Sequence, residues 1–128
     1  MRGDPGIAAL VRRSEGVLMS MVVIGELLYG FRYGRRYAEN RAQLEDFLAE
    51  PITCTLDVSL DTAGRFGTIA GALRRKGRPI PTNDIWIAAH ALQAGAELLT
   101  YDAHFDAVEG LSWTRLTAAP GGESNGAG

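Results

Sequence analysis

The sequence predicts an α/β fold with a mainly parallel sheet. Short apolar runs alternate with longer segments of helical periodicity, and glycine or proline marks most of the boundaries between them. At 128 residues the chain is long enough for one domain with its own hydrophobic core. We expect that domain over residues 4–117, followed by a disordered tail over residues 118–128 that offers little for a core to bury.

The first three elements follow from local signals. Asp4 and Pro5 are typical of an N-cap and a first helical position, and apolar residues at helical spacing follow them, so we expect a helix that reaches Arg13. A glycine ends this pattern, and residues 17–21 are expected to form a short buried strand. A helix is then predicted over about residues 22–33.

The middle of the chain is expected to hold two helices and one strand. Residues 35–50 carry an apolar stripe at helical spacing, and Pro51 ends that helix. Residues 52–55 are rich in β-branched side chains and predict the next strand. Residues 57–76 predict a long helix, although three glycines weaken it.

The last elements are the best delimited. Residues 82–94 are expected to form a helix that ends at Gly95. Residues 97–100 predict a strand, residues 103–108 a short helix or turn, and residues 113–116 a final strand. Because single strands alternate with helices rather than with tight hairpin turns, the sheet is expected to be mainly parallel.

Composition is ordinary for a soluble globular protein. No apolar run approaches the ~20 residues that a membrane-spanning helix needs, so we expect no membrane association. The single cysteine, Cys54, fits a reducing compartment, and we expect a cytoplasmic protein. The net charge is −2, yet all the basic residues except Lys76 are arginines, whose planar guanidinium group suits bidentate contacts with phosphate.

Three carboxylates stand among apolar or small residues: Glu26, Asp84 and Asp102. Burial of an ionised carboxylate is costly unless the group is paired or binds a metal, so the three together suggest one cation and a metal-dependent phosphodiester chemistry. Asp102 follows a predicted strand, and open parallel sheets bind ligands beyond the carboxyl ends of their strands. Thr100 ends that strand and could bond a carboxylate or a metal-bound water.

Each of these residues also has a purely structural interpretation. Glu26 could face solvent, Asp84 could stabilise a helix N-terminus capped by Thr82, and Asp102 could cap the turn that follows it. Gly25 and a second glycine one turn later weaken the helix around Glu26, which indicates that another backbone or a ligand approaches closely there.

Four motifs in order make the chain resemble the PIN-domain ribonucleases, in particular the VapC-type toxins of bacterial toxin–antitoxin pairs. They are Gly-Glu-Leu-x-Tyr-Gly at 25–30, Ala-Leu-Arg-Arg-x-Gly-x-Pro-Ile at 72–80, Asn-Asp-x-x-Ile-Ala-Ala at 83–89 and Thr-x-Asp-x-x-Phe at 100–105. The resemblance implies a PIN-like three-layer fold, and an enzyme that hydrolyses RNA phosphodiester bonds with Mg²⁺ or Mn²⁺.

The resemblance also assigns residues to the site. Glu26, Asp84 and Asp102 would be catalytic metal ligands, with Asn83 and Thr100 in supporting roles. The cation would polarise the phosphate and activate a water molecule. No histidine or lysine near these motifs is expected to act as a base.

The family's first acid, in an Asp-Thr-Asn or Asp-Thr-Ser motif after an N-terminal strand, has no counterpart here. We therefore expect the first, central strand of the sheet to be missing, through a misassigned start or a shortened chain. A chain that begins at Met1 is expected to have little or no nuclease activity. The alternative function is a non-catalytic PIN fragment that binds only an antitoxin or a second copy of itself. A phosphorelay receiver or another phosphohydrolase is not indicated, because the required aspartate and lysine are absent from the expected places.

The resemblance further implies three partners: an RNA substrate, a cognate VapB-like antitoxin and a second copy in a homodimer. Aromatic residues of the first two long helices are candidates for an antitoxin groove, namely Tyr29, Phe31, Tyr33 and Tyr37. Arginines are candidates for RNA contacts, namely Arg32, Arg35, Arg74, Arg75 and Arg78. Core packing and solvated helix faces are the respective alternatives.

Overall fold

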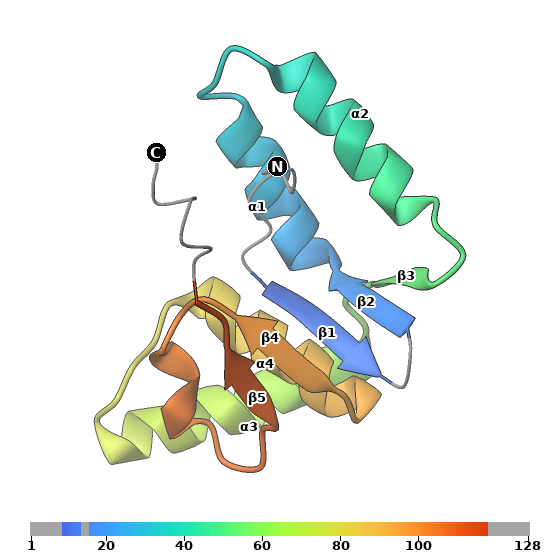
Figure 1. Cartoon of the computed structure of the whole chain (residues 1–128). Helices are drawn as coiled ribbons and strands as arrows, with labels where there is room; N and C mark the ends of the chain where they lie inside the picture. Colours follow the sequence, from blue (N-terminus) through green and yellow to red (C-terminus); the bar gives the residue numbers. More distant parts are fainter. Residues whose placement is uncertain (1–8, 14–15, 118–128) are drawn as a thin grey trace.

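One five-stranded sheet, in the order β3-β2-β1-β4-β5, is the framework of the molecule (Figure 1). The computed structural model describes residues 9–13 and 16–117. The strands are β1 (Ala9–Arg13), β2 (Gly16–Ser20), β3 (Thr53–Leu56), β4 (Glu97–Thr100) and β5 (Trp113–Arg115). The helices are α1 (Met21–Phe31), α2 (Tyr37–Leu48), α3 (Leu60–Lys76) and α4 (Thr82–Ala94), with a 3₁₀ turn, η1 (His104–Ala107). The predicted α/β fold is confirmed.

Four of the strands run in the same direction, and the central strand β1 runs against them. β2 pairs with β3 and β4 with β5 in parallel, whereas β1 is antiparallel to both β2 and β4. Val11 lies at the middle of the sheet, opposite Leu18 on one side and Leu98 on the other, and is 1% exposed. The two parallel halves of the sheet are therefore joined through one antiparallel strand.

Strand β1 corrects two expectations from the sequence. The helix predicted to reach Arg13 is wrong over residues 9–13, which form β1, while Asp4 and Pro5 lie outside the described residues. The central position of the sheet is also not missing, because β1 fills it. A short apolar run fits helix and strand equally well by its spacing, and pairing with neighbours on both sides then decides the outcome. The tail over residues 118–128 lies outside the described residues.

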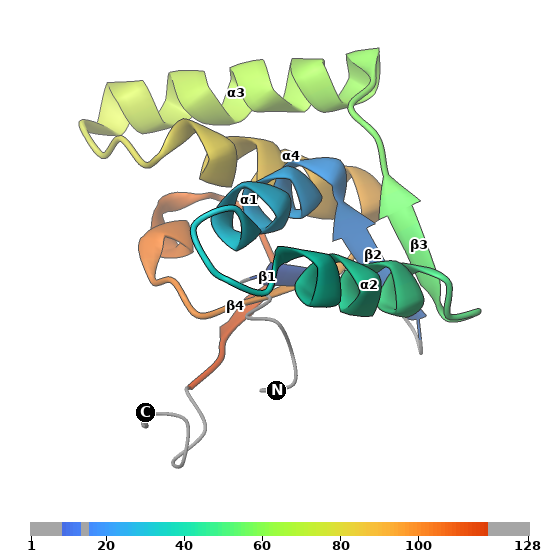
Figure 2. The same ribbon diagram turned by 90° about the horizontal axis from the view of Figure 1, so that it is seen from above.

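The helices stack against the sheet in layers. α3 packs on α4, and α4 lies between α3 and the strands (Figures 1 and 2). The middle of α4 is almost completely buried as a result, including Ile87, Ala88 and Ala89. Small alanine side chains allow this close approach on both sides of the helix.

Helix ends follow the chemistry that the sequence displays. Ser20 caps α1, and Ser59 caps α3 in a capping box with Thr62. Gly77 and Gly95 end α3 and α4 in the left-handed conformation, with φ of 69° and 61°. Thr82 is not a cap, because Pro81 occupies that position and makes no side-chain hydrogen bond to the helix.

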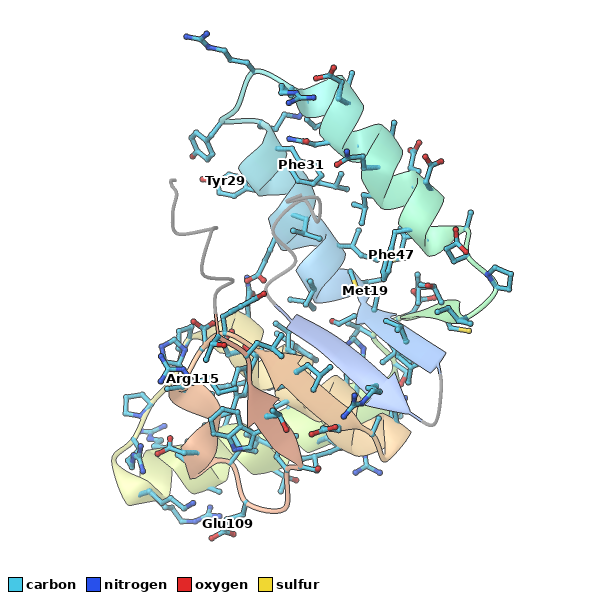
Figure 3. All side chains as sticks on the ribbon, in the orientation of Figure 1. Met19, Tyr29, Phe31, Phe47, Glu109 and Arg115 are labelled. Atoms are coloured by element: carbon cyan, nitrogen blue, oxygen red, sulfur yellow. The ribbon has the colours of Figure 1, made fainter. Side chains whose placement is uncertain are left out.

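α1 and α2 form a separate pair beside the sheet. Phe31 and Phe47 lie where the two helices face each other (Figure 3). Gly25 and Gly30 of α1 have no atom within 4 Å of the position of an added Cβ, so the close approach predicted there is not observed among the described residues. Within the same residues, no helix is both long and apolar enough to cross a membrane.

Candidate active site

Two of the predicted acids meet at the end of β4. One carboxylate oxygen each of Asp84 and Asp102 and one ring nitrogen of His104 all lie within 4.8 Å of one another. Asp84 belongs to the first turn of α4, Asp102 follows β4, and His104 begins η1. The site therefore lies beyond the carboxyl end of a strand, as expected for an α/β sheet.

Asp84 is the buried member of this cluster. It is 8% exposed, and its Oδ2 lies 2.8 Å from Nδ1 of His104. Burial of its carboxylate is offset by this contact and by the N-terminus of α4, whose free N–H groups favour negative charge. Asp84 is thus held in place while Asp102 and His104 remain open to solvent.

Thr100 shapes the turn that carries Asp102. Its hydroxyl accepts a hydrogen bond of 3.1 Å from the backbone N–H of Asp102, and the threonine itself is 1% exposed. This bond fixes the chain where Asp102 leaves the strand, and the hydroxyl proton remains available as a donor. The supporting role predicted for Thr100 toward a carboxylate or a metal-bound water stays a prediction.

Glu26 lies beside the cluster rather than in it. The side-chain amide of Asn83 donates a hydrogen bond of 3.0 Å to Oε2 of Glu26 from α1. Asn83 precedes Asp84, so this bond links the third predicted acid to the N-terminus of α4. Glu26 is not a member of the set of ligand atoms that lie within 4.8 Å of one another.

His104 is the residue that the sequence interpretation missed. The sequence interpretation named no histidine as a candidate base near these motifs, yet His104 directly contacts Asp84. The signal was present: His104 lies inside the Thr-x-Asp-x-x-Phe motif, two residues after Asp102. Its partner Asp84, however, is 20 residues away along the chain, and only the fold brings the two together.

Arg115 was also missed as a candidate. It pairs with Thr100 in the register of β4 and β5, and its Nε donates to the carbonyl oxygen of Tyr101 at 3.3 Å (Figure 3). An exposed guanidinium group therefore lies next to the loop that carries Asp102. Its position as the last residue of the final strand was the available signal.

The arginines proposed from the sequence are all exposed, but they occupy different places. Arg74 and Arg75 lie in the last turn of α3, and Arg78 pairs with Asp106 of η1 at 3.1 Å. Arg32 stacks over the ring of Tyr37 at 3.9 Å, and Arg35 lies in the connection between α1 and α2. These five arginines belong to two separate segments of the chain, one after α1 and the other at the end of α3.

The predicted aromatic surface is only partly exposed. Tyr29 and Tyr33 are 65% and 77% exposed and bond to each other through their hydroxyl groups. Tyr37 is half-buried, and Phe31 is 6% exposed. Including Phe31 in an exposed groove is therefore wrong, because its side chain is part of the core.

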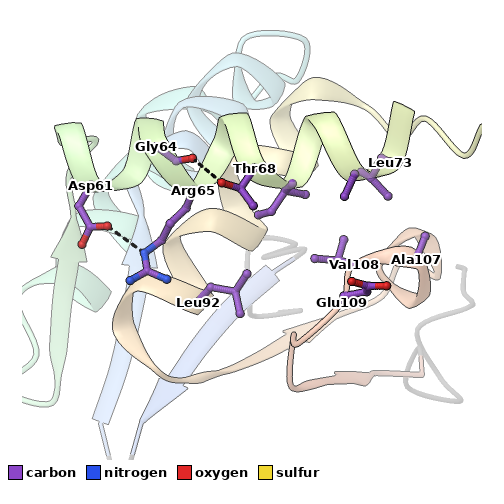
Figure 4. Close-up of a pocket in the computed structure, with 11 residues that line it drawn as sticks. Asp61, Gly64, Arg65, Thr68, Leu73, Leu92, Ala107, Val108 and Glu109 are labelled. Carbon is purple, nitrogen blue, oxygen red and sulfur yellow. Dashed lines mark hydrogen bonds and ion pairs between the residues drawn. The ribbon is translucent and has the colours of Figure 1, made fainter. Parts of the chain in front are cut away.

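A hollow of about 580 Å³ lies elsewhere, between α3 and η1 (Figure 4). Leu73 and Val108 contribute apolar walls, while Asp61 and Arg65 form an ion pair of 2.9 Å at one end. None of its lining residues belongs to the Asp84 cluster. The hollow and the acidic cluster are therefore separate features of the described residues.

The cluster has the donors that a divalent cation requires. Two carboxylates and an imidazole suit Mn²⁺ and related ions, and the carboxylates with water suit Mg²⁺. Asp84 is buried, whereas Asp102 and His104 are exposed, so water molecules and a phosphate group can reach the cluster from solvent. The residues therefore fit the metal-dependent chemistry that the sequence suggested.

The sequence of the chain is similar to those of known proteins. Residues 2–111 match the PIN domain family. Ribonuclease VapC1 from Haemophilus influenzae (strain R2866) is 31% identical over 105 residues, which cover 81% of this chain and 77% of that protein.

Solved structures give the same result at the level of the fold. VapBC2 from Rickettsia felis, bound to a DNA fragment from their promoter, gives a TM-score of 0.69 at 28% identity, covering 77% of this chain and 73% of that chain. VapBC-5 from Mycobacterium tuberculosis, a member of the VapBC family of toxin-antitoxin systems, gives 0.64 at 29% identity, with coverages of 76% and 79%. The chain, which shares the fold and most of its length with these proteins, belongs to the PIN-domain family, among the relatives of the VapC ribonucleases.

Proposed function

We propose that this protein is a metal-dependent endoribonuclease toxin of the VapC type, which acts in the cytoplasm and is neutralised by a cognate antitoxin. The observation that carries the proposal is the meeting of Asp84 and Asp102 at the carboxyl end of β4. The identity with ribonuclease VapC1 supports the reaction, and the likeness to VapBC complexes supports the antitoxin partner.

Asp84 and Asp102 would hold the cation, which is Mg²⁺ or Mn²⁺. When bound, such an ion polarises a phosphodiester and promotes its attack by water. Asp84 contributes a ligand whose position is fixed by burial, and Asp102 contributes one at the end of the turn that Thr100 organises. Glu26, bonded to Asn83, would add negative charge on the α1 side and accept hydrogen bonds from water.

Activity can be tested by RNA cleavage with Mg²⁺ or Mn²⁺, with and without a chelator. In a parent chain that cleaves RNA under these conditions, we expect Asp84→Asn and Asp102→Asn each to reduce cleavage by about 100-fold or more, because loss of a ligand removes several kcal/mol of transition-state stabilisation. Asp61→Asn is the matched control, since Asp61 is an exposed acid paired with Arg65 on α3. Full cleavage by both site variants would refute the proposed site.

The antitoxin contact is proposed for the exposed face of α1 and the loop after it. Tyr29 and Tyr33 expose large aromatic surfaces there, which are typical of protein interfaces. We expect Tyr29→Ala with Tyr33→Ala to weaken binding of the antitoxin without changing RNA cleavage. Binding of the antitoxin by a chain that cleaves no RNA under any of these conditions would instead favour the non-catalytic alternative. A homodimer stays a prediction, which light scattering of the purified chain can test.

A further inference from the structure

We propose that His104 is itself a ligand of the cation, and that this nitrogen makes the site favour Mn²⁺ over Mg²⁺. The inference rests on the proposed metal-dependent function and goes beyond it by naming the residue that selects the ion. It depends on the geometry, the burial and the chemistry of three side chains.

The positions of the three groups match neighbouring ligands of one ion. Nδ1 of His104 lies 2.8 Å from Oδ2 of Asp84, and an oxygen of Asp102 lies within 4.8 Å of both. Adjacent ligands of an octahedral ion with bonds of about 2.1 Å are separated by about 3 Å, and opposite ligands by about 4.2 Å. The 2.8 Å separation of His104 and Asp84 is therefore close to that of two adjacent ligands, and ligation by Nδ1 requires that this nitrogen carry no proton.

One oxygen of Asp84 is available to a cation in this arrangement. Asp84 is 8% exposed, yet among the described residues its Oδ2 bonds only to His104, and no hydrogen bond to its Oδ1 is observed. Thr53 Oγ1 is the only fully buried side-chain oxygen without a partner among the described residues, so Oδ1 of Asp84 is not one and remains available to an ion or a water molecule. The His104 side chain is 46% exposed, so an ion from solvent can reach it.

The ligand set then determines the ion. Mg²⁺ takes oxygen ligands and keeps much of its water, so an imidazole adds little to its binding. Mn²⁺ accepts oxygen ligands and also binds imidazole, as first-row transition ions do. A site of two carboxylates and one histidine should therefore distinguish the two ions, whereas a purely carboxylate site would do so much less.

A different role for His104 predicts a different result. If the imidazole only orients Asp84, removing it should weaken binding of every divalent ion by the same factor. If it is a ligand, the loss should fall mainly on Mn²⁺. The comparison between the two ions thus separates ligation from positioning.

The experiment is metal titration of the full, untagged chain by calorimetry, with Mg²⁺ and Mn²⁺ in turn. For His104→Asn we expect Mn²⁺ affinity to fall about tenfold and Mg²⁺ affinity to change by less than about twofold. Asp106→Asn is the matched control, because Asp106 lies in the same short η1 turn but pairs with Arg78. Equal losses for the two ions, or no loss, would overturn the inference.

Pulsed electron paramagnetic resonance of the Mn²⁺-loaded chain gives a readout independent of activity. A ¹⁴N coupling from a directly bound imidazole should be present in the unmodified chain and absent from His104→Asn. A coupling that persists in the variant would contradict the assignment. The variant Asp84→Asn separates the two proposals. If Asp84→Asn binds Mn²⁺ as tightly as the unmodified chain does, the proposed metal site is wrong. If Mn²⁺ affinity falls in Asp84→Asn but not in His104→Asn, the metal site stands and only ligation by His104 is rejected.

Discussion

At the scale of single residues, the hydroxyl group of Ser20 both caps helix α1 and contacts the buried His90. It accepts a hydrogen bond from the backbone N–H of Val22 at the start of α1, and it lies 2.8 Å from Nδ1 of His90. His90 is fully buried, and its Nε2 donates to the carbonyl oxygen of Asp57 at 3.1 Å. With Nε2 protonated in the neutral ring, Nδ1 accepts the hydroxyl proton of Ser20.

Ser20→Ala should therefore cost more than the loss of a helix cap. We expect a decrease of about 2–4 kcal/mol in the free energy of unfolding, because the variant loses the cap and leaves a buried imidazole nitrogen unpaired. Ser59→Ala, which removes the cap of α3, should cost about 1 kcal/mol. Urea denaturation measures both, and equal costs would show that the His90 contact contributes nothing.

Arg115 provides a second test at this scale. Its guanidinium lies beside the Asp102 loop and is exposed, so it is placed to contact an RNA phosphate near the cleavage site. We expect Arg115→Gln to weaken RNA binding for all sequences alike and to reduce the salt dependence of binding by about one unit of slope. Arg41→Gln is the control, because Arg41 is engaged with Glu45 and Tyr37 on α2. An unchanged slope for Arg115→Gln would remove this residue from the RNA path.

At the scale of elements, the glycines of α3 and α4 fall into two kinds. Gly95 ends α4 with φ of 61°, where a side chain is strained, whereas Gly67 lies inside α3 with open space around it. The first glycine is required by the backbone, and the second only lowers helix stability.

Alanine should consequently act in opposite directions at these two positions. Gly67→Ala is expected to raise the free energy of unfolding by about 0.5–1 kcal/mol, and Gly95→Ala to lower it by about 1 kcal/mol. Thermal unfolding followed by circular dichroism distinguishes them. A stabilising effect at Gly95 would mean that the left-handed end of α4 is not retained in solution.

At the scale of the whole molecule, β1 holds the sheet together. In the described sheet, β1 pairs with β2 on one side and with β4 on the other, and it is antiparallel to both. β2 and β4 each have a second, parallel partner, β3 and β5, so β1 joins the two parallel pairs. On its exposed side Arg12 pairs with Glu97, whose pKa is lowered by hydrogen bonds from Thr114 and then Arg12. This contact links β1 to β4 and β5.

Proline at Val11 tests the central position of β1. Val11→Pro removes a backbone donor in the middle of the sheet and should lower the free energy of unfolding by about 3 kcal/mol or more. Thr114→Pro in the edge strand β5 should cost less, because one side of that strand is unpaired within the described sheet. Similar costs measured by urea denaturation would mean that residues 9–13 do not occupy the centre of the sheet.

Local sequence signals were sufficient to predict the type and approximate bounds of most helices and strands beyond residue 16. The predicted helix over residues 82–94 and strand over residues 97–100 agree with α4 and β4 to the residue, because Gly95 separates two clear periodic patterns. The other helix ends differ by a few residues, as at α3, which starts at Leu60 behind the cap Ser59. Caps and periodicity act within a few residues of the chain, so the sequence displays them directly.

The sequence by itself determined the alternation of strands and helices, the family, and the three acids that were candidates for metal binding. The tertiary structure decided the direction of β1, the contact of His104 with Asp84, and the place of Glu26 against Asn83. These features depend on pairing between segments far apart in the chain, and periodicity carries no information about such partners. A short apolar run can take either conformation, and only its neighbours in the sheet select one.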